Sequence, residues 1–265
     1  MLEHTFLHIP GIGPTTEQAL WQQGIHTWDA ALQLADPGCS VRPRTRTLLQ
    51  HYLPGSHRAL QDGNAAYFAQ LCNIGESWRT YSHFRDVVFL DIETTGLSPR
   101  YDEITLVGVS DGQTYTVFIA GQNLADLPAY LSRFRVITTF NGAGFDLRFI
   151  RAAFPDLALP PLHIDLRGVT RKLGLTGGLK TIEQTLGLPR DPAVAHLSGF
   201  DAVILWKRYR RGDRKALDLL IQYNTEDVVH LTTILETSYA ALTRRATALF
   251  AHPGAAPHGS NVSVP

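Results

Sequence analysis

The segment VVFLDIETTGLSP (residues 87–99) ends an apolar run with two closely spaced carboxylates. The run from Val87 is typical of a buried strand. Because side chains alternate between the two faces of a strand, Asp91 and Glu93 are expected to point to the same side. Two like charges so close repel each other unless something neutralises them, and Mg²⁺ and Mn²⁺ prefer oxygen ligands. The pair therefore indicates a divalent-metal site, although on its own it fits a solvated strand end equally well.

Two further segments carry acids in ordered settings. ITTFNGAGFDLRFI (residues 137–150) is a β-branched run that breaks and then starts a helix with Asp146 in its first turn. The helix dipole favours acids there, so ordinary helix-start chemistry is the alternative for Asp146. LIQYNTEDVVHL (residues 219–230) places Tyr223 and Asp227 four positions apart, on one face of a helix. The alternative for this segment is an exposed helical turn.

Composition bounds the class of protein. The chain has 265 residues, of which 44% are hydrophobic, enough for one large domain or a large one with a small one. No apolar run approaches the roughly 18 residues of a membrane span, and the first residues lack a secretory signal, so a cytoplasmic protein is expected. Cys39 and Cys72 are too few for a disulfide framework. Lys and Arg total 24, as do Asp and Glu, so nucleic acid would have to bind through local patches. No feature indicates a membrane or a protein partner.

The chain changes character near residue 80. Residues 1–80 are loop-rich and helical in pattern, which predicts a small helical module. Residues 81–248 mix strand and helix patterns, and residues 249–265 are expected to form a disordered tail. Strands are expected at 86–93, 104–110, 114–120 and 134–140, and helices at 124–134, 145–154, 179–186, 201–211 and 214–245. Three successive strands followed by mixed elements predict an α/β domain with a mixed sheet.

The segments FLDIETTGL, FNGAGFD and YNTED resemble the three exonuclease motifs of the DEDD superfamily, the ribonuclease-H-like nucleases that include polymerase proofreading domains. The resemblance covers about residues 84–240 and is specific in the combination of motifs. It implies a ribonuclease-H-like mixed sheet flanked by helices. In one branch of this superfamily, a tyrosine four residues before the last aspartate assists the attacking water. Tyr223 stands at this position, so the chain resembles the tyrosine branch. The chain also resembles a bacterial group of predicted ribonuclease-H-like exonucleases, in which this position often holds histidine.

The resemblance implies a role for each motif residue. Asp91, Glu93, Asp146 and Asp227 would hold two Mg²⁺ or Mn²⁺ ions, with Asp91 bridging both. Glu93 and Asp227 would favour the ion that binds the attacking water, and Asp146 would act mainly through the second ion. Tyr223 would orient the water by a hydrogen bond and not act as a strong base, because an unperturbed phenol has a pKa of about 10 and keeps its proton at neutral pH. The implied reaction is 3′–5′ hydrolysis of phosphodiester bonds at DNA or RNA 3′ ends.

Other residues are candidates for contact with the substrate. The resemblance places Thr94 and Leu97 beside the terminal nucleotide, with Leu97 against a base; a plain turn with a buried leucine is the alternative. Asn141 of the second motif is carried over in the same way. Lys180 closes DLRGVTRKLGLTGGLK (residues 165–180), a second basic segment that also contains Arg167, Arg171 and Lys172.

The segment WKRYRRGDRK (residues 206–215) interleaves basic and aromatic side chains. Cations for phosphates and aromatic faces for bases are what a single strand requires. The alternative, which we favour, is a solvated helix surface with Trp206 in the core. The candidates for substrate binding in this segment are Lys207, Arg208, Arg210 and Arg211.

The segment IPGIGPTTEQALWQQGIHTWDAAL (residues 9–32) resembles a helix–hairpin–helix element, whose backbone amides hold phosphates without sequence preference. The alternative, which we favour, is a module that only packs. For the whole chain we expect a metal-dependent 3′–5′ exonuclease. The alternatives are a nucleic-acid-binding protein with a vestigial nuclease site and a ribonuclease-H-like endonuclease. The complete set of acids favours the enzyme, and the choice between DNA and RNA stays open.

Overall fold

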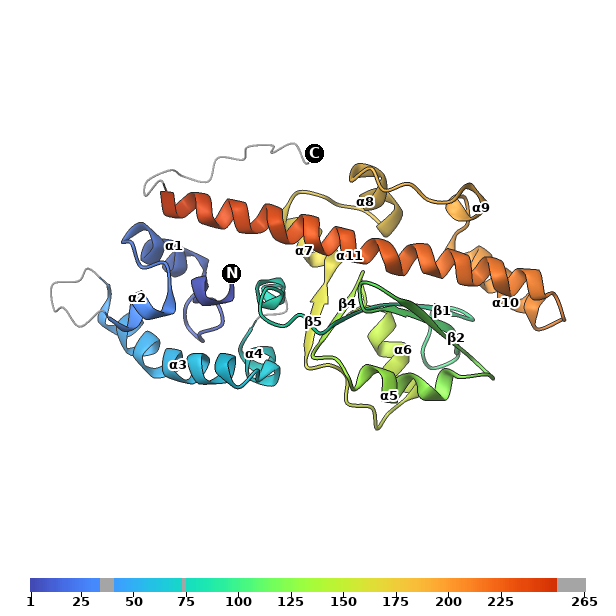
Figure 1. Cartoon of the computed structure of the whole chain (residues 1–265), viewed down its shortest axis with the longest axis horizontal. Helices are drawn as coiled ribbons and strands as arrows, with labels where there is room; N and C mark the ends of the chain where they lie inside the picture. Colours follow the sequence, from blue (N-terminus) through green and yellow to red (C-terminus); the bar gives the residue numbers. More distant parts are fainter. Residues whose placement is uncertain (34–40, 73–74, 252–265) are drawn as a thin grey trace. The chain divides into compact units, whose positions relative to one another are not determined.

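The computed structural model describes residues 1–33, 41–72 and 75–251 (Figure 1). Cys39 lies outside these residues. The chain divides into two compact units, Met1–Arg85 with the residues from Ser238 onward, and Asp86–Thr237. The division falls within the long helix α11 (Arg214–Ala251). The domain boundaries expected at residues 80 and 248 stay predictions, because a compact unit need not be a domain. Helix α11 extends into the expected tail of residues 249–265, of which 252–265 lie outside the described residues.

A five-stranded mixed sheet forms the centre of the unit Asp86–Thr237, in the order β3-β2-β1-β4-β5. The strands are β1 (Val87–Thr94), β2 (Ile104–Ser110), β3 (Tyr115–Ile119), β4 (Val136–Thr139) and β5 (Leu162–Asp165). The pairs β1–β2 and β2–β3 are antiparallel, whereas β1–β4 and β4–β5 are parallel. The expected α/β class and mixed sheet are confirmed. Strand β5 (LHID) was not predicted, because it lacks the β-branched run that marks the equally short β4 (VITT).

Strand β1 presents different chemistry on its two faces. Val88, Leu90 and Ile92 point into a core that also contains residues of α5 (Leu127–Leu131) and α6 (Asp146–Ala153). The opposite face carries Asp91 and Glu93. Each fully buried aliphatic side chain stabilises the fold by about 1.5–3 kcal/mol, so the alternation fixes which way the acids point.

The acid-bearing face of the sheet is covered by α10 (Gly199–Tyr209) and by α11. Leu106 of β2 packs there with Leu205, Leu220 and Tyr223. Figure 1 shows α10 and α11 on one side of the sheet and α5 and α6 on the other. Helix α11 therefore carries its side chains directly over the end of β1.

The remaining elements of this unit are shorter. They are the 3₁₀ turn η3 (Leu124–Asp126) and the helices α7 (Leu166–Lys172), α8 (Leu179–Thr185) and α9 (Pro192–Ala195). Helix α7 was not predicted; the Asp165 side chain caps it by accepting a hydrogen bond from the Arg167 amide at 3.1 Å. A capping box between Ser198 and Asp201 starts α10, which begins at Gly199, whereas the sequence pattern predicts its start at residue 201.

The other unit is helical. Its elements are η1 (Leu2–His4), α1 (Pro14–Gln22), α2 (Trp28–Leu32), α3 (Pro43–Gln61), α4 (Ala65–Leu71) and η2 (Ser77–Thr80). Phe6, Trp28 and Phe68 are fully buried in its interior. The buried Glu17 carboxylate accepts hydrogen bonds from the Thr5 hydroxyl at 2.6 Å and the Phe6 amide at 2.7 Å. Phosphate binding by the helix–hairpin–helix-like segment stays a prediction.

Candidate metal centre

Three carboxylates from two elements converge at the end of β1. Asp91 and Glu93 come from β1, and Asp227 comes from α11. One oxygen from each lies within 4.8 Å of the others, which forms a potential metal-binding group among the described residues. Glu93 is 6% exposed and Asp227 7% exposed, while Asp91 is half-buried. Residues more than 130 positions apart in the sequence thus meet at one point, as their motifs predict.

Asp146 adjoins this acidic group. It lies in the first turn of α6, is 3% exposed, and its Oδ1 accepts a hydrogen bond from the Ile92 amide at 3.2 Å. Burial, together with the charges of Asp165 and Asp227, raises the pKa of Asp146 to about 7, against the lowering effect of its backbone hydrogen bonds. Asp146 does not belong to the group of three that lies within 4.8 Å. Its role as a ligand therefore stays a prediction.

The acidic group carries more negative charge than its surroundings neutralise. Burial, and then the neighbouring carboxylates, raise the pKa of Asp91 well above its ordinary value. Burial and the charge of Asp227 raise the pKa of Glu93 in the same way. Burial also raises the pKa of Asp227, to about 6. Oxygen donors with an excess of negative charge are the ligand set that suits a hard divalent cation, so the residues present fit Mg²⁺ or Mn²⁺.

Asn224 orients two of the carboxylates. Its Nδ2 donates to Asp91 Oδ2 at 2.9 Å and lies 3.4 Å from Glu93 Oε1, while its Oδ1 accepts from the Tyr115 hydroxyl at 2.9 Å. Gly108 of β2, which pairs with Asp91, provides the space for the Asn224 side chain, because a Cβ at this glycine would lie 1.7 Å from Asn224 Oδ1. Asn224 was not among the predicted site residues, although its place one helical turn before Asp227 was the available signal.

Arg190 forms an ion pair with Asp227 and was not among the predicted site residues. Its Nε and Nη2 each donate to the buried Glu183 carboxylate at 2.6 Å, and Nη2 also donates to Asp227 Oδ1. His230 Nδ1 lies 3.0 Å from Glu183 Oε1. The charge of Arg190 opposes the burial that raises the pKa of Asp227. Arg190 lies in the loop between α8 and α9, so no periodicity in the sequence pointed to it.

Tyr223 lies one helical turn before Asp227 and is 7% exposed. The Lys180 ammonium lies 5.3 Å and the Arg190 guanidinium 5.8 Å from the centroid of its ring. Burial and the charges of Asp227 and Glu93 raise the pKa of the Tyr223 phenol. The hydroxyl therefore stays protonated at neutral pH, which suits a hydrogen-bond donor and not a base. Water positioning by Tyr223 stays a prediction.

The turn after β1 places its candidate substrate residues differently. Thr94 is buried, and its hydroxyl donates to the Gly96 carbonyl at 2.5 Å. Leu97 is 86% exposed, so the alternative of a buried turn leucine is wrong. An exposed leucine four residues after Glu93 is available to a ligand. Contact of Thr94 and Leu97 with a terminal nucleotide stays a prediction.

Asn141 and Lys180 both engage protein groups. Asn141 adopts φ +67°, its amide donates to Asp165 Oδ1 at 2.8 Å, and its side-chain oxygen accepts from Arg167 at 2.7 Å. The Lys180 ammonium donates to the Ala195 carbonyl at 3.1 Å and to the Leu197 carbonyl. These carbonyls occupy two of the three donors of the Lys180 ammonium, which leaves one donor for a ligand. Substrate binding by Asn141 and Lys180 stays a prediction.

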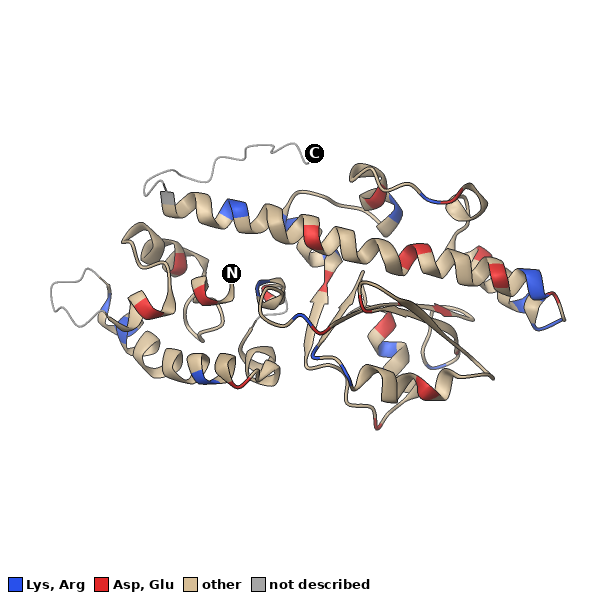
Figure 2. Cartoon of the chain, in the orientation of Figure 1, with Lys and Arg blue, Asp and Glu red and all other residues tan. Residues whose placement is uncertain are grey.

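The basic segment 206–215 lies at the junction of α10 and α11, where Figure 2 shows a group of Lys and Arg. Its four candidate residues are exposed: Lys207, Arg208, Arg210 and Arg211. Trp206 is 6% exposed within the core, so it packs as the alternative predicts. Arg208 is paired with Asp213 at 2.7 Å. Nucleic-acid binding by this segment stays a prediction, without Trp206 as a stacking platform.

A family model described as the RNase H superfamily matches residues 88–239, more than half of the chain. The chain belongs to the RNase H superfamily. Its matched region contains the sheet, the acidic group and most of α11. The RNase H-like fold expected from the three motifs is thereby confirmed, and it is a nuclease-type fold. No curated protein sequence matches the chain.

Solved structures with a similar chain path include nucleases. The family B DNA polymerase of Pyrobaculum calidifontis is 15% identical, with 61% of this chain and 24% of the polymerase covered and a TM-score of 0.46. A nuclease in its apo form is 23% identical, with 66% and 84% covered and a TM-score of 0.45. NrnC of Brucella melitensis with bound Mg²⁺ is 24% identical, with 63% and 81% covered and a TM-score of 0.40. The chain thus spans about a quarter of the polymerase.

No helix in the described parts of the chain has both the length and the apolar character that a membrane crossing requires.

Proposed function

We propose that this protein is a metal-dependent 3′–5′ exonuclease that hydrolyses phosphodiester bonds at the ends of DNA or RNA strands. The observation that carries the proposal is the convergence of Asp91, Glu93 and Asp227 within 4.8 Å, in a chain of the RNase H superfamily. The 3′–5′ direction follows from the resemblance of the three motifs to the DEDD exonucleases.

Divalent metal fits the acidic group, and Asp91, Glu93 and Asp227 would hold it, with Asp146 adjoining. When bound, two such ions supply an activated water and relieve the charge on the leaving oxygen. The protein would keep its carboxylates ionised and oriented towards the metal. Asn224 does so for Asp91 by donating to Oδ2 at 2.9 Å.

Two other side chains support the proposed reaction. Arg190, locked on Glu183, keeps a positive charge beside Asp227 and so favours the ionised carboxylate that a cation needs. Tyr223 keeps its proton because its pKa is raised, so its hydroxyl can donate a hydrogen bond to a water or to a phosphate oxygen. Neither residue requires a change of protonation during turnover.

The test uses strands labelled at the 5′ end: single-stranded DNA, duplex DNA and RNA, each with Mg²⁺, Mn²⁺ or EDTA. We expect a ladder of successively shorter labelled products that needs metal. Asp91→Asn should abolish the ladder. Asp218→Asn removes an exposed acid from α11 and should leave it unchanged.

Other product patterns would contradict the proposal in distinct ways. Internal cuts without a ladder would indicate a ribonuclease-H-like endonuclease. Binding of strands without cleavage under any metal would indicate the vestigial alternative. A ladder that persists in folded Asp91→Asn protein would remove the acidic group from the mechanism.

A further inference from the structure

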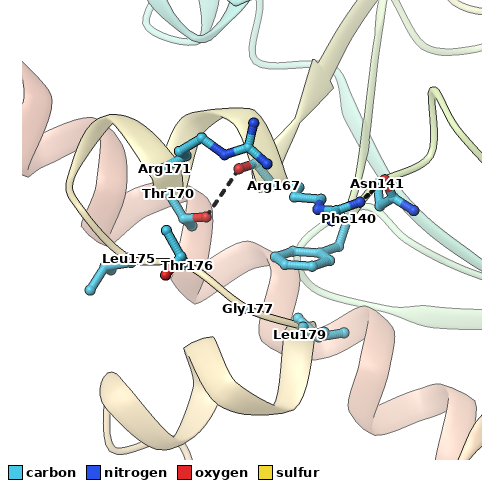
Figure 3. Close-up of a pocket in the computed structure, with 10 residues that line it drawn as sticks. Phe140, Asn141, Arg167, Thr170, Arg171, Leu175, Thr176, Gly177 and Leu179 are labelled. Carbon is cyan, nitrogen blue, oxygen red and sulfur yellow. Dashed lines mark hydrogen bonds between the residues drawn. The ribbon is translucent and has the colours of Figure 1, made fainter.

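A pocket of about 600 Å³ lies in the unit Asp86–Thr237, outside the acidic group (Figure 3). Three segments line it: the loop after β4, helix α7, and the glycine-containing loop that leads to α8. The lining side chains that matter here are Phe140, Asn141, Arg167, Arg171, Thr176 and Leu179. This volume lies within the range of pockets that hold small molecules or one unit of a polymer.

Two segments of the pocket wall lead along the chain to candidate site residues. The loop that contains Asn141 leads into α6, where the Gly142 carbonyl accepts from the Leu147 amide at 3.0 Å next to Asp146. On the other side, Leu179 precedes Lys180, whose ammonium lies 5.3 Å from the Tyr223 ring centroid. The pocket wall is thus continuous along the chain with Asp146 on one side and with Lys180 on the other.

The pocket is positively charged. Arg167 and Arg171 lie four residues apart on one face of α7 and are both exposed. The residues lining the pocket include no carboxylate. Within the described part of the chain, no acid forms an ion pair with either guanidinium group, and the Arg167 guanidinium donates to the neutral Asn141 side chain, at 2.7 Å. Two guanidinium groups without an acidic partner are suited to a phosphate group.

Part of the pocket lining is apolar. Figure 3 shows the half-buried Phe140 ring and Leu179 lining the pocket, with Arg167 and Arg171 extending from α7. An aromatic face binds any base by stacking, whatever the sequence. The loop is also preformed, because Asp165 accepts hydrogen bonds from the Asn141 amide at 2.8 Å and from the Ala143 amide at 3.2 Å. Preformed sites lose less entropy when they bind.

From this geometry we infer that the pocket binds one nucleotide of the substrate strand next to the scissile position, with the phosphate at Arg167 and Arg171 and the base against Phe140. The inference rests on the proposed function, because it takes the bound strand to be the substrate. It defines the substrate class as a strand with at least one nucleotide beyond the scissile bond. A phosphodiester with a small leaving group and no second nucleotide leaves the pocket empty.

The first experiment measures binding without cleavage. Short fluorescent single strands are titrated with the full-length protein in EDTA over a range of salt concentrations. Arg171→Gln should raise the Kd by about 10- to 100-fold. It should also reduce the slope of log K against log salt by about 0.7, the value for one phosphate contact on a single strand. Phe140→Leu should raise the Kd by about fivefold or more without changing the salt slope. Arg148→Gln, an exposed arginine of α6, should change neither.

The second experiment measures cleavage with metal. Arg171→Gln should raise KM for the strand with little change in kcat, and should leave kcat/KM unchanged for thymidine 5′-monophosphate p-nitrophenyl ester, which lacks a second nucleotide. If the wild type cleaves strands and folded Arg171→Gln binds and cleaves them equally well, the inference fails and the proposed function stands. If the wild type cleaves nothing while Arg171→Gln still lowers affinity and salt slope, the pocket stands and the nuclease proposal fails. If thymidine monophosphate occupies the pocket as tightly as a strand, and Arg171→Gln weakens only the monophosphate, the strand assignment is overturned.

Discussion

Two opposing effects set the pKa of the Asp227 carboxyl. Burial raises its pKa to about 6, while the Arg190 charge acts in the other direction. Arg190 is itself fixed by Glu183, and both side chains are almost fully buried, at 6% and 2% exposure. A buried ion pair that loses one partner leaves an uncompensated charge, which costs far more than a surface pair contributes.

Arg190→Gln should therefore destabilise the metal-free protein by about 3–5 kcal/mol, because Glu183 and Asp227 lose their shared cation. Unfolding in urea, followed by circular dichroism in EDTA, measures the loss. Arg148→Gln serves as the matched control and should stay within about 0.5 kcal/mol of the wild type. A loss below about 1 kcal/mol for Arg190→Gln would show that the pair is not buried as described.

Protons should compete with metal at the acidic group. The pKa of Asp146 is raised to about 7 and that of Asp227 to about 6, so both carboxyls take up protons as the pH falls from 8 to 5.5. Only the ionised forms bind a cation, so the affinity for Mn²⁺ should fall at least about tenfold over this interval. Calorimetric titration at the two pH values measures it. Asp218→Asn should show the same decrease, and equal affinity at both pH values would contradict the raised pKa values.

At the scale of elements, the fit between β1, β2 and α11 depends on one position without a side chain. Gly108 stands opposite Asp91, and Asn224 of α11 fills the space above it. The polar side chain that orients the acids thus occupies the volume that a larger residue in β2 would need. The geometry of the metal centre therefore depends on strand pairing as much as on the acids.

Gly108→Ala should destabilise the protein by about 1–3 kcal/mol and weaken Mn²⁺ binding, because the new methyl group must displace Asn224 from Asp91 and Glu93. Thermal unfolding and metal titration of the same variant measure the two effects. Gly168→Ala, in the exposed part of α7 with nothing within 4 Å of its Cβ position, should be neutral or stabilising by up to about 1 kcal/mol. Similar effects from both substitutions would rule out the steric explanation.

The sequence predicted the elements whose signals are local. The apolar run before Asp91 and the long periodic pattern of α11 identified β1 and the helix that faces it. Strand β5 lacks the β-branched run of the equally short β4, helix α7 contains Gly168, a poor helix former, and Asp165, which caps α7, reads as an ordinary polar residue. The roles of Arg190 and Asn224 come from contacts with residues 37 and 133 positions away, respectively, and the sequence signal for Asn224 is limited to its place one helical turn before Asp227. The spacing of the motifs indicates which carboxylates meet, but only the packed structure shows which side chains orient these carboxylates and neutralise their charge.

On the scale of the whole molecule, pH should act on the two compact units with opposite signs. The buried carboxyls of the unit Asp86–Thr237 have raised pKa values, so the metal-free folded state binds more protons than the unfolded chain between about pH 4 and 7. Their contribution to stability therefore grows as the pH falls through this window. In the unit that begins at Met1, His8 is 1% exposed, and burial lowers its pKa to about 4. There the unfolded chain binds more protons between about pH 4 and 6.5, so stability is lost as the pH falls.

His8→Asn should remove the loss in the helical unit. His8 Nε2 lies 2.9 Å from the Ser56 hydroxyl and its ring packs 5.0 Å from that of Trp28, so protonation would bury a charge among apolar groups. Between pH 7 and pH 5 the wild type should lose up to about 2 kcal/mol that the variant does not lose. Tryptophan fluorescence during urea unfolding measures it, because Trp21, Trp28 and Trp78 all belong to this unit. His51→Asn, at an exposed position of α3, should keep the wild-type pH dependence, and the same dependence in His8→Asn would contradict the burial of a neutral His8.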